Sequence, residues 1–151
     1  MERSGPIHLV LEQAYQFNVE FGLVDVPALV TDATPPLGQA RGPDSEMLLV
    51  ASVANCLCAS LAFALRKFKN DSVSMSATAS AQLTRNEQGR QRVQSIQVDI
   101  RLEAPASALR LWERALAQYE DFCVVTQSVR AAIPISVRVR DREDVLLAVS
   151  D

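Results

Sequence analysis

The sequence MLLVASVANCLCASLAFAL, from Met47 to Leu65, contains no charged residue and holds two of the chain's three cysteines. It meets the length of a membrane-spanning helix, about 18 residues or more. Three polar residues, Ser52, Asn55 and Ser60, interrupt it, and alanine replaces much of the leucine and isoleucine typical of a span. Such polar side chains need a partner helix in lipid. We therefore predict a buried core helix of a soluble protein and no membrane contact.

The residues on either side of this stretch bracket a helix. The preceding segment, Asp32 to Asp44, is rich in Pro and Gly and predicts an irregular loop. Ser45 is expected to be the N-cap, and Glu46 lies in the first turn, where the helix dipole favours an anion. Basic residues follow at the C-terminal end, as Arg66, Lys67 and Lys69. The helix is therefore expected to begin near Ser45.

Alternating apolar and polar residues predict strands on both sides of the helix. Before it, residues 15–21 alternate and residues 28–31 offer a short second strand. After it, residues 73–84 alternate, with the small side chains Ala77, Ala79 and Ala81 on the inner face. Residues 86–89 then predict a hairpin turn, and residues 96–102 form the returning strand.

The C-terminal third predicts two helices and a last strand. A helix beginning at Pro105 places Leu109, Trp112, Leu116 and Tyr119 on one face. A shorter helical stretch runs from Cys123 to Ala131, and residues 133–139 form the last strand, with Arg138 and Arg140 pointing outward. The whole chain, 1–151, is predicted to be a single α+β domain with antiparallel sheet.

Composition narrows the classes of function. The chain has 151 residues and a net charge of −3, and its pI is near 5.2, so it lacks the basic surface of a nucleic-acid-binding protein. The N-terminus has no apolar core or cleavage pattern of a secretory signal. We expect a cytoplasmic protein whose cysteines rest reduced.

The spacing of Cys56 and Cys58 argues against a metal site. Residues two apart on an α-helix point about 200° away from each other, and the only histidine, His8, is far away in the sequence. No glycine-rich phosphate loop and no catalytic serine motif occurs. We expect no metal and no cofactor.

The thiols themselves remain as candidates for chemistry. Cys56 and Cys58 are either small hydrophobes in a helix interface or reactive groups. Cys123 stands at the start of a predicted helix, where the dipole favours a thiolate, and Arg130 follows two helical turns later. Cys123 is either a redox group or a packing residue beside Phe122.

Two segments resemble the OsmC/Ohr family of thiol-dependent hydroperoxide reductases. These are GPDSEMLLVASVANCLCASLAFALRK and, after about 65 residues, YEDFCVVTQSVRAAIPISVRV. The resemblance covers almost the whole chain, including the strand order, and is closer to a less characterised branch of OsmC-like proteins. It implies a two-layer α+β fold, with antiparallel sheets around a central buried helix, that forms an intertwined homodimer.

The resemblance also implies roles for individual residues. Cys56 would be the peroxidatic cysteine, and Cys123 would be the resolving one. Glu46 matches a glutamate that in the family's peroxidases holds an arginine against the reactive sulfur. Glu46 precedes Cys56 by ten residues, about 15 Å along a straight helix, so we expect the partner subunit to bring them together. The substrate would be an organic hydroperoxide, and an external dithiol would be the reductant.

The sequence departs from the family pattern at the activating arginine. In the family it belongs to the early strands, and here no arginine occurs between Arg3 and Arg41. Arg41 and Arg130 are the candidates to replace it, and Val124 stands where the family commonly has proline. Two alternatives to a peroxidase therefore stay open. One is a non-catalytic protein that binds a small apolar ligand, and the other is a disulfide-handling redox protein.

Overall fold

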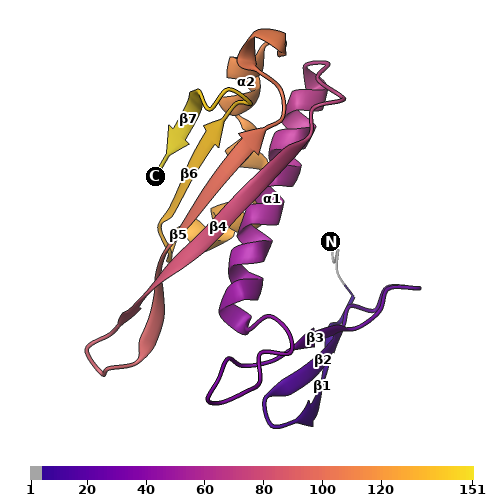
Figure 1. Cartoon of the computed structure of the whole chain (residues 1–151), viewed down its shortest axis with the longest axis vertical. Coiled ribbons are helices and arrows are strands. Elements are labelled where there is room, and N and C mark those ends of the chain that lie inside the picture. The colour runs from indigo at the N-terminus through magenta and orange to yellow at the C-terminus, as the bar shows by residue number, and fades with distance from the viewer. Residues whose placement is uncertain (1–4) are drawn as a thin grey trace. The chain divides into compact units, whose positions relative to one another are not determined.

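The computed structural model describes residues 5–151 and divides the chain into two compact units, Met1–Leu49 and Val50–Asp151. The first unit holds a three-stranded sheet (Figure 1). The second holds a four-stranded sheet and most of the helical residues. The mixed α+β class predicted from the sequence is confirmed.

The sheet of the first unit is an antiparallel meander of β1 (His8–Gln13), β2 (Gln16–Glu20) and β3 (Leu29–Thr31). β2 and β3 match the two strands expected before the helix. β1 was not predicted, because Leu9, Val10 and Leu11 are consecutive apolar residues rather than an alternating pattern. All six residues of β1 are exposed in the isolated chain.

A buried carboxylate organises the loop after β3. Asp32 is 5% exposed and accepts hydrogen bonds from the backbone N–H groups of Gln39 (3.0 Å) and Arg41 (3.2 Å). Burial by itself raises the pKa of Asp32, but these hydrogen bonds outweigh it, and the pKa lies below its ordinary value. The loop is irregular, as expected, but it is held in one conformation.

Helix α1 (Ser45–Lys67) covers the uncharged stretch and continues to the basic residues at its end. Its N-cap is Asp44, whose Oδ1 accepts a hydrogen bond from the backbone N–H of Met47 at 2.8 Å. The prediction of Ser45 as N-cap was wrong by one residue. Aspartate and serine serve equally well as caps, so the local sequence did not distinguish between them.

The sheet of the second unit has the order β4-β5-β6-β7, formed by Met75–Arg85, Gln91–Leu102, Ile135–Arg140 and Leu146–Ser150. The β4–β5 hairpin is antiparallel, as predicted, and its turn is closed by a hydrogen bond from the N–H of Asn86 to the carbonyl of Arg90. β5 and β6, however, are parallel. The expectation of a purely antiparallel sheet was therefore wrong for this pair.

The parallel pair follows from the connection between β5 and β6. Parallel neighbours need a crossover, and here it contains η1 (Ala106–Ala108), α2 (Trp112–Leu116), η2 (Tyr119–Phe122) and α3 (Val124–Arg130). The single helix expected from Pro105 is instead broken at Leu111, whose φ of 48° is left-handed. β7 was not predicted, because the sequence pattern predicts residues 133–139 to be the last strand.

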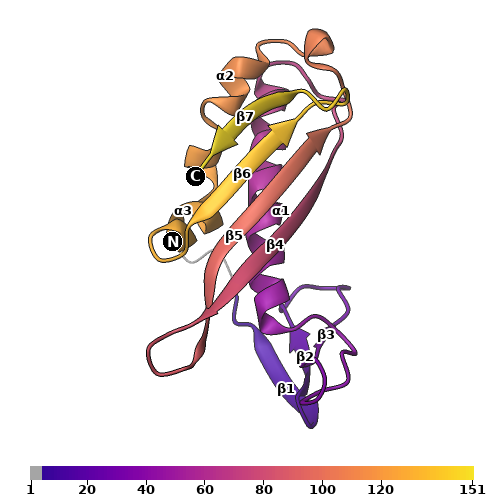
Figure 2. The ribbon, with the colours of Figure 1, turned by 60° about the vertical axis from the view of Figure 1, so that its left-hand side comes forward.

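The core of the second unit lies between α1 and one face of this sheet. Figure 2 shows the part of α1 from Val50 onward running along the sheet. Its buried residues form one stripe, Val53, Leu57, Leu61, Ala64 and Leu65. The buried residues of β5 alternate at Ile96, Val98, Ile100 and Leu102. By length and composition alone α1 is apolar enough to cross a membrane, but this stripe shows that it packs on the sheet.

The opposite face of α1 carries exposed residues in the described part of the chain. Ala51, Asn55 and Ala59 are exposed, and the Phe63 side chain is 65% exposed. The predicted core helix is therefore buried along one side in this chain.

Candidate functional site

The two cysteines of α1 lie on opposite flanks of its buried stripe. Both are half-buried and neither is in a disulfide. Because a residue advances about 100° around the helix, Cys56 and Cys58 border the core from different sides. This agrees with the prediction that they do not share one ligand.

Cys123 is fully buried and lies immediately before α3, in extended backbone. Its Sγ donates a hydrogen bond of 2.9 Å to Oγ1 of Thr126, which is also fully buried. Cys56 lies close enough to contribute to the raised pKa of Cys123. The structure thus brings together the two cysteines that were expected to form a pair, although they belong to segments far apart in the chain.

The environment of Cys123 raises its pKa. Burial is the largest cause and the neighbouring Cys56 adds to it, while the hydroxyl and backbone N–H of Thr126 act in the opposite direction. The expectation that the helix dipole would favour a thiolate was therefore wrong in net direction. This environment disfavours the thiolate form of Cys123.

Cys58 faces a different group of residues. Burial raises the pKa of its thiol. The pKa of Tyr119, which is 1% exposed, is raised strongly, first by burial and then by Glu120, with a smaller contribution from Cys58. Cys58 thus lies near a buried phenol.

Arg130 forms an ion pair with Glu120. Its Nη2 donates a hydrogen bond of 2.6 Å to Oε2 of Glu120, whose other oxygen accepts a 2.6 Å hydrogen bond from the hydroxyl of Ser150. The Nε of Arg130 is buried without a hydrogen-bond partner. Arg130 was expected to lie on the same helix face as Cys123, as a candidate to activate a thiol. Its ion pair is with Glu120.

The other two residues of the predicted site belong to the first unit. The Nε of Arg41 donates to Oε1 of Gln39 at 2.9 Å. Glu46 is exposed and helps line a hollow of about 200 Å³ together with Tyr15, Phe17 and Thr31. The three cysteines all belong to the second unit.

In residues 5–151 no group of three or more His, Cys, Asp or Glu side chains is arranged to hold an ion. His8 is an exposed residue of β1.

Known proteins share the sequence pattern and the fold of this chain. The sequence pattern of the family described as OsmC-like protein matches residues 38–138, about two thirds of the chain. The chain belongs to the OsmC-like family. No protein with a curated description matches it by sequence.

Solved structures support the same fold for this OsmC-like protein. It is similar to a putative osmotic stress induced and detoxification response protein from Psychrobacter arcticus, with a TM-score of 0.74 and 14% identity over 93% of this chain and 98% of the other. An OsmC-like protein of unknown function from Vibrio cholerae gives 0.72 and 16%, over 92% and 99%. The organic hydroperoxide resistance protein OhrB of Bacillus subtilis gives 0.65 and 14%, over 89% and 96%. At these identities the likeness shows the fold alone.

Two residues of the site were missed from the sequence. Thr126 contacts Cys123, and its spacing of three residues places it in the first turn after the cysteine, which was a usable signal. Glu120 pairs with Arg130 across ten residues, and no local pattern indicated that pair.

Proposed function

We propose that this OsmC-like protein is a thiol-dependent hydroperoxide reductase that uses Cys56 and Cys123. The observation that supports the proposal best is the proximity of the two thiols, since Cys56 is among the groups that raise the pKa of Cys123. Helix α1 and the crossover between β5 and β6 supply one thiol each, so a bond between them joins two elements of the same core.

The proposed cycle has three balanced steps. The Cys56 thiol loses its proton to solvent, and the thiolate attacks the distal oxygen of an organic hydroperoxide. The O–O bond breaks to give Cys56 sulfenic acid and an alkoxide, which takes one proton from solvent and leaves as the alcohol. The Cys123 sulfur then attacks the Cys56 sulfur, and its proton leaves with the hydroxide as water. An external dithiol finally reduces the disulfide and is itself oxidised.

The raised pKa of Cys123 suits the resolving role. A resolving thiol attacks only after the sulfenic acid has formed, so it has no need to be a thiolate at rest. Its proton is then available to the departing hydroxide. Cys56, at the border of the core and half-buried, is the more accessible of the two.

A homodimer is part of the proposal. The exposed side of α1 carries Phe63, and the edge strand β1 exposes Leu9, Val10 and Leu11. Apolar area of this extent favours association. The partner subunit would bring Glu46, and with it an arginine, towards Cys56. Arg41 is the better candidate, because Arg130 is already paired with Glu120.

Three single variants test the function. The wild type should consume cumene hydroperoxide when a dithiol such as dihydrolipoamide is supplied, and Cys56→Ser should abolish turnover. Cys123→Ser should stop turnover but still allow one equivalent of peroxide to react. Cys58→Ser is the matched control and should retain activity.

A mass measurement makes the test independent of the reductant. After one equivalent of hydroperoxide, wild-type protein should contain a peptide pair linked through Cys56 and Cys123. Absence of the link, together with no peroxide consumption with any dithiol, would contradict the proposal.

The second candidate is a non-catalytic protein that binds a small apolar ligand. It is favoured by one observation: no arginine occurs between Arg3 and Arg41, the part of the chain to which the family's activating arginine belongs. This candidate requires an apolar molecule, such as a fatty acid, to copurify with the protein. Its affinity would be unchanged in the Cys56→Ser/Cys123→Ser double variant.

A further inference from the structure

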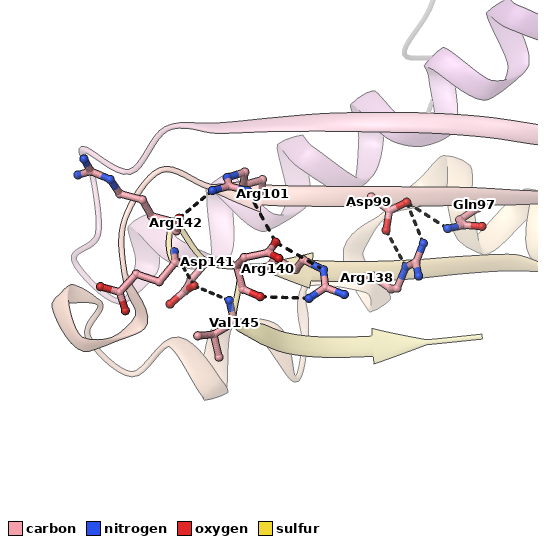
Figure 3. A network of polar contacts seen from close by, with 10 residues as sticks. Gln97, Asp99, Arg101, Arg138, Arg140, Asp141, Arg142 and Val145 are labelled. Atoms are coloured by element: carbon pink, nitrogen blue, oxygen red, sulfur yellow. Dashed lines mark hydrogen bonds and ion pairs between the residues drawn. The ribbon is translucent and has the colours of Figure 1, made fainter.

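Three arginines that the cysteine chemistry does not use lie on the outer face of the four-stranded sheet. Side chains alternate between the two faces of a strand. Because Val98 and Val139 are buried in the core, their neighbours along β5 and β6 point to the opposite face. These outward residues include Arg101, Arg138 and Arg140 (Figure 3).

Strand register gathers these arginines with other polar side chains. Across β4, β5 and β6, one row consists of Ser76, Arg101 and Arg140. The row two residues along consists of Thr78, Asp99 and Arg138. These six residues line a cavity of about 320 Å³. Its size is that of a site for one small molecule.

Arg138 is balanced by Asp99. Its Nε donates to Oδ1 of Asp99 at 2.6 Å and its Nη2 donates to Oδ2 at 3.2 Å. Asp99 also accepts a 3.1 Å hydrogen bond from Gln97. This two-pronged geometry is the strong form of an arginine–carboxylate pair, so Arg138 contributes little free charge to the cavity.

Arg101 and Arg140 are balanced only loosely. They share one carboxylate oxygen, Oδ1 of Asp144, at 3.7 Å from Nη1 of Arg101 and 4.0 Å from Nε of Arg140. Both distances exceed a hydrogen bond, and the Asp144 side chain is 69% exposed. The hydrogen bonds of the two guanidinium groups go instead to the backbone carbonyls of Arg142 (2.8 Å) and Asp144 (3.1 Å).

We propose that this cavity binds the phosphate group of a small phosphorylated molecule between Arg101 and Arg140, with the phosphate taking the place of the Asp144 carboxylate. Each guanidinium has five N–H donors, and only a few are used. The hydroxyls of Ser76 and Thr78 supply further donors at the floor of the cavity.

Charge argues for a phosphate rather than a carboxylate. A phosphate monoester carries about −1.5 to −2 at pH 7 and offers three acceptor oxygens. Asp141 acts on Arg101 and Asp99 acts on Arg140, but the ion pairs of the two arginines are with Asp144. When Asp144 moves away, the two guanidinium groups lose those ion pairs, and a dianion can bridge them. A monocarboxylate carries the same single negative charge as the Asp144 side chain and would gain little by displacing it. The site does not rest on the proposed peroxidase activity.

The test is a titration of labelled protein with inorganic phosphate at constant ionic strength, followed by two-dimensional NMR. Saturable shifts are expected at the amides of Ser76, Thr78, Arg101 and Arg140. Glycerol 3-phosphate should bind at least as tightly as phosphate, and acetate much more weakly. Equal binding of acetate, or shifts that do not saturate, would overturn the proposal.

Charge-matched variants locate the site. Arg101→Gln and Arg140→Gln should each weaken phosphate binding by about tenfold or more, as expected for lost hydrogen bonds to a charged group. Arg92→Gln removes the same charge from the far end of β5, where Arg92 contacts only the carbonyl of Gln91 among the hydrogen bonds described, and should leave binding unchanged. A similar loss in Arg92→Gln would show diffuse attraction and contradict a defined site.

Asp144→Asn tests the displacement. The backbone of Asp144 has a φ of 66°, a conformation that asparagine tolerates well, so this variant should fold. Removal of the competing carboxylate should tighten phosphate binding several-fold. Unchanged or weaker binding would show that phosphate does not take its place.

Discussion

The Sγ of Cys123 donates a 2.9 Å hydrogen bond to Oγ1 of Thr126, and both side chains are fully buried. This contact fixes the direction of the sulfur in a site from which water is excluded. It also opposes the two influences that raise the pKa of the thiol, burial and Cys56. Thr126 is therefore a positioning residue for the proposed resolving cysteine.

Thr126→Val should raise the pKa of Cys123 further, because it removes the hydroxyl that stabilises the thiolate and keeps the side-chain volume. Thr126→Ser should behave like the wild type. The measurement is a pH titration of thiolate ultraviolet absorbance in a Cys56→Ser/Cys58→Ser background. A downward shift in the valine variant would show that the hydroxyl does not support the thiolate.

Truncation of Leu57 and of Phe63 should change stability differently, because Leu57 is buried in the core and Phe63 is exposed. Leu57 is 0% exposed, and Leu57→Ala should lower the free energy of unfolding by about 2–5 kcal/mol. Chemical denaturation of the purified protein measures it. A loss below about 0.5 kcal/mol would contradict the packing of α1 on the sheet.

Phe63→Ala should weaken the proposed homodimer and leave the fold of each subunit intact. Phe63 is 65% exposed in the isolated chain, so its truncation removes few contacts within the subunit. Sedimentation equilibrium should show a weaker dimer, while circular dichroism shows unchanged secondary structure. A wild-type protein that stays monomeric at all concentrations would contradict the dimer.

Glu120→Gln should destabilise the protein by about 1–3 kcal/mol, the range for hydrogen bonds to charged groups. The change leaves the partly buried Arg130 without its counter-charge and weakens the contact with Ser150. Glu113→Gln, at an exposed position of α2, is the control and should have little effect. Equal stability of both variants would mean that the ion pair contributes nothing.

Asp141 should make stability depend on acid pH. Its carboxylate is 1% exposed and accepts hydrogen bonds from the N–H groups of Ala106, Glu143 and Val145, and these lower its pKa below the ordinary value. A lowered folded-state pKa means that the stabilisation is complete above the unfolded-state pKa of about 3.9 and is lost as pH falls through the lower folded-state value. Asp141→Asn should flatten the thermal stability profile below about pH 4. If the thermal stability of Asp141→Asn falls with acid pH as steeply as that of the wild type, this role is contradicted.

Local patterns in the sequence were sufficient for several elements. The uncharged run with basic residues after it predicted α1, and strict alternation predicted β2 and the β4–β5 hairpin. In each case a periodic pattern longer than one turn or one strand pair is itself the cause of the structure. The choice of Cys56 and Cys123 came from a resemblance to a family, and the structure makes them neighbours without testing their roles.

Other features depended on contacts distant in sequence. β1 and β7 were missed because their residues do not alternate clearly, and the parallel pairing of β5 and β6 arises from the path of the crossover. The break at Leu111 places a left-handed residue inside a helical pattern that was otherwise consistent.

The sequence by itself determined the core helix, most of the strands, and that two of the three thiols lie on one apolar helix, because hydrophobic periodicity is local. Only the tertiary structure decided which groups meet: Cys56 with Cys123, Cys123 with Thr126, Arg130 with Glu120, and two arginines around one loosely held carboxylate. The reason is physical, since burial and charge pairing depend on elements brought together by the whole fold, and only the contact of Cys123 with Thr126 follows from a short spacing along the chain.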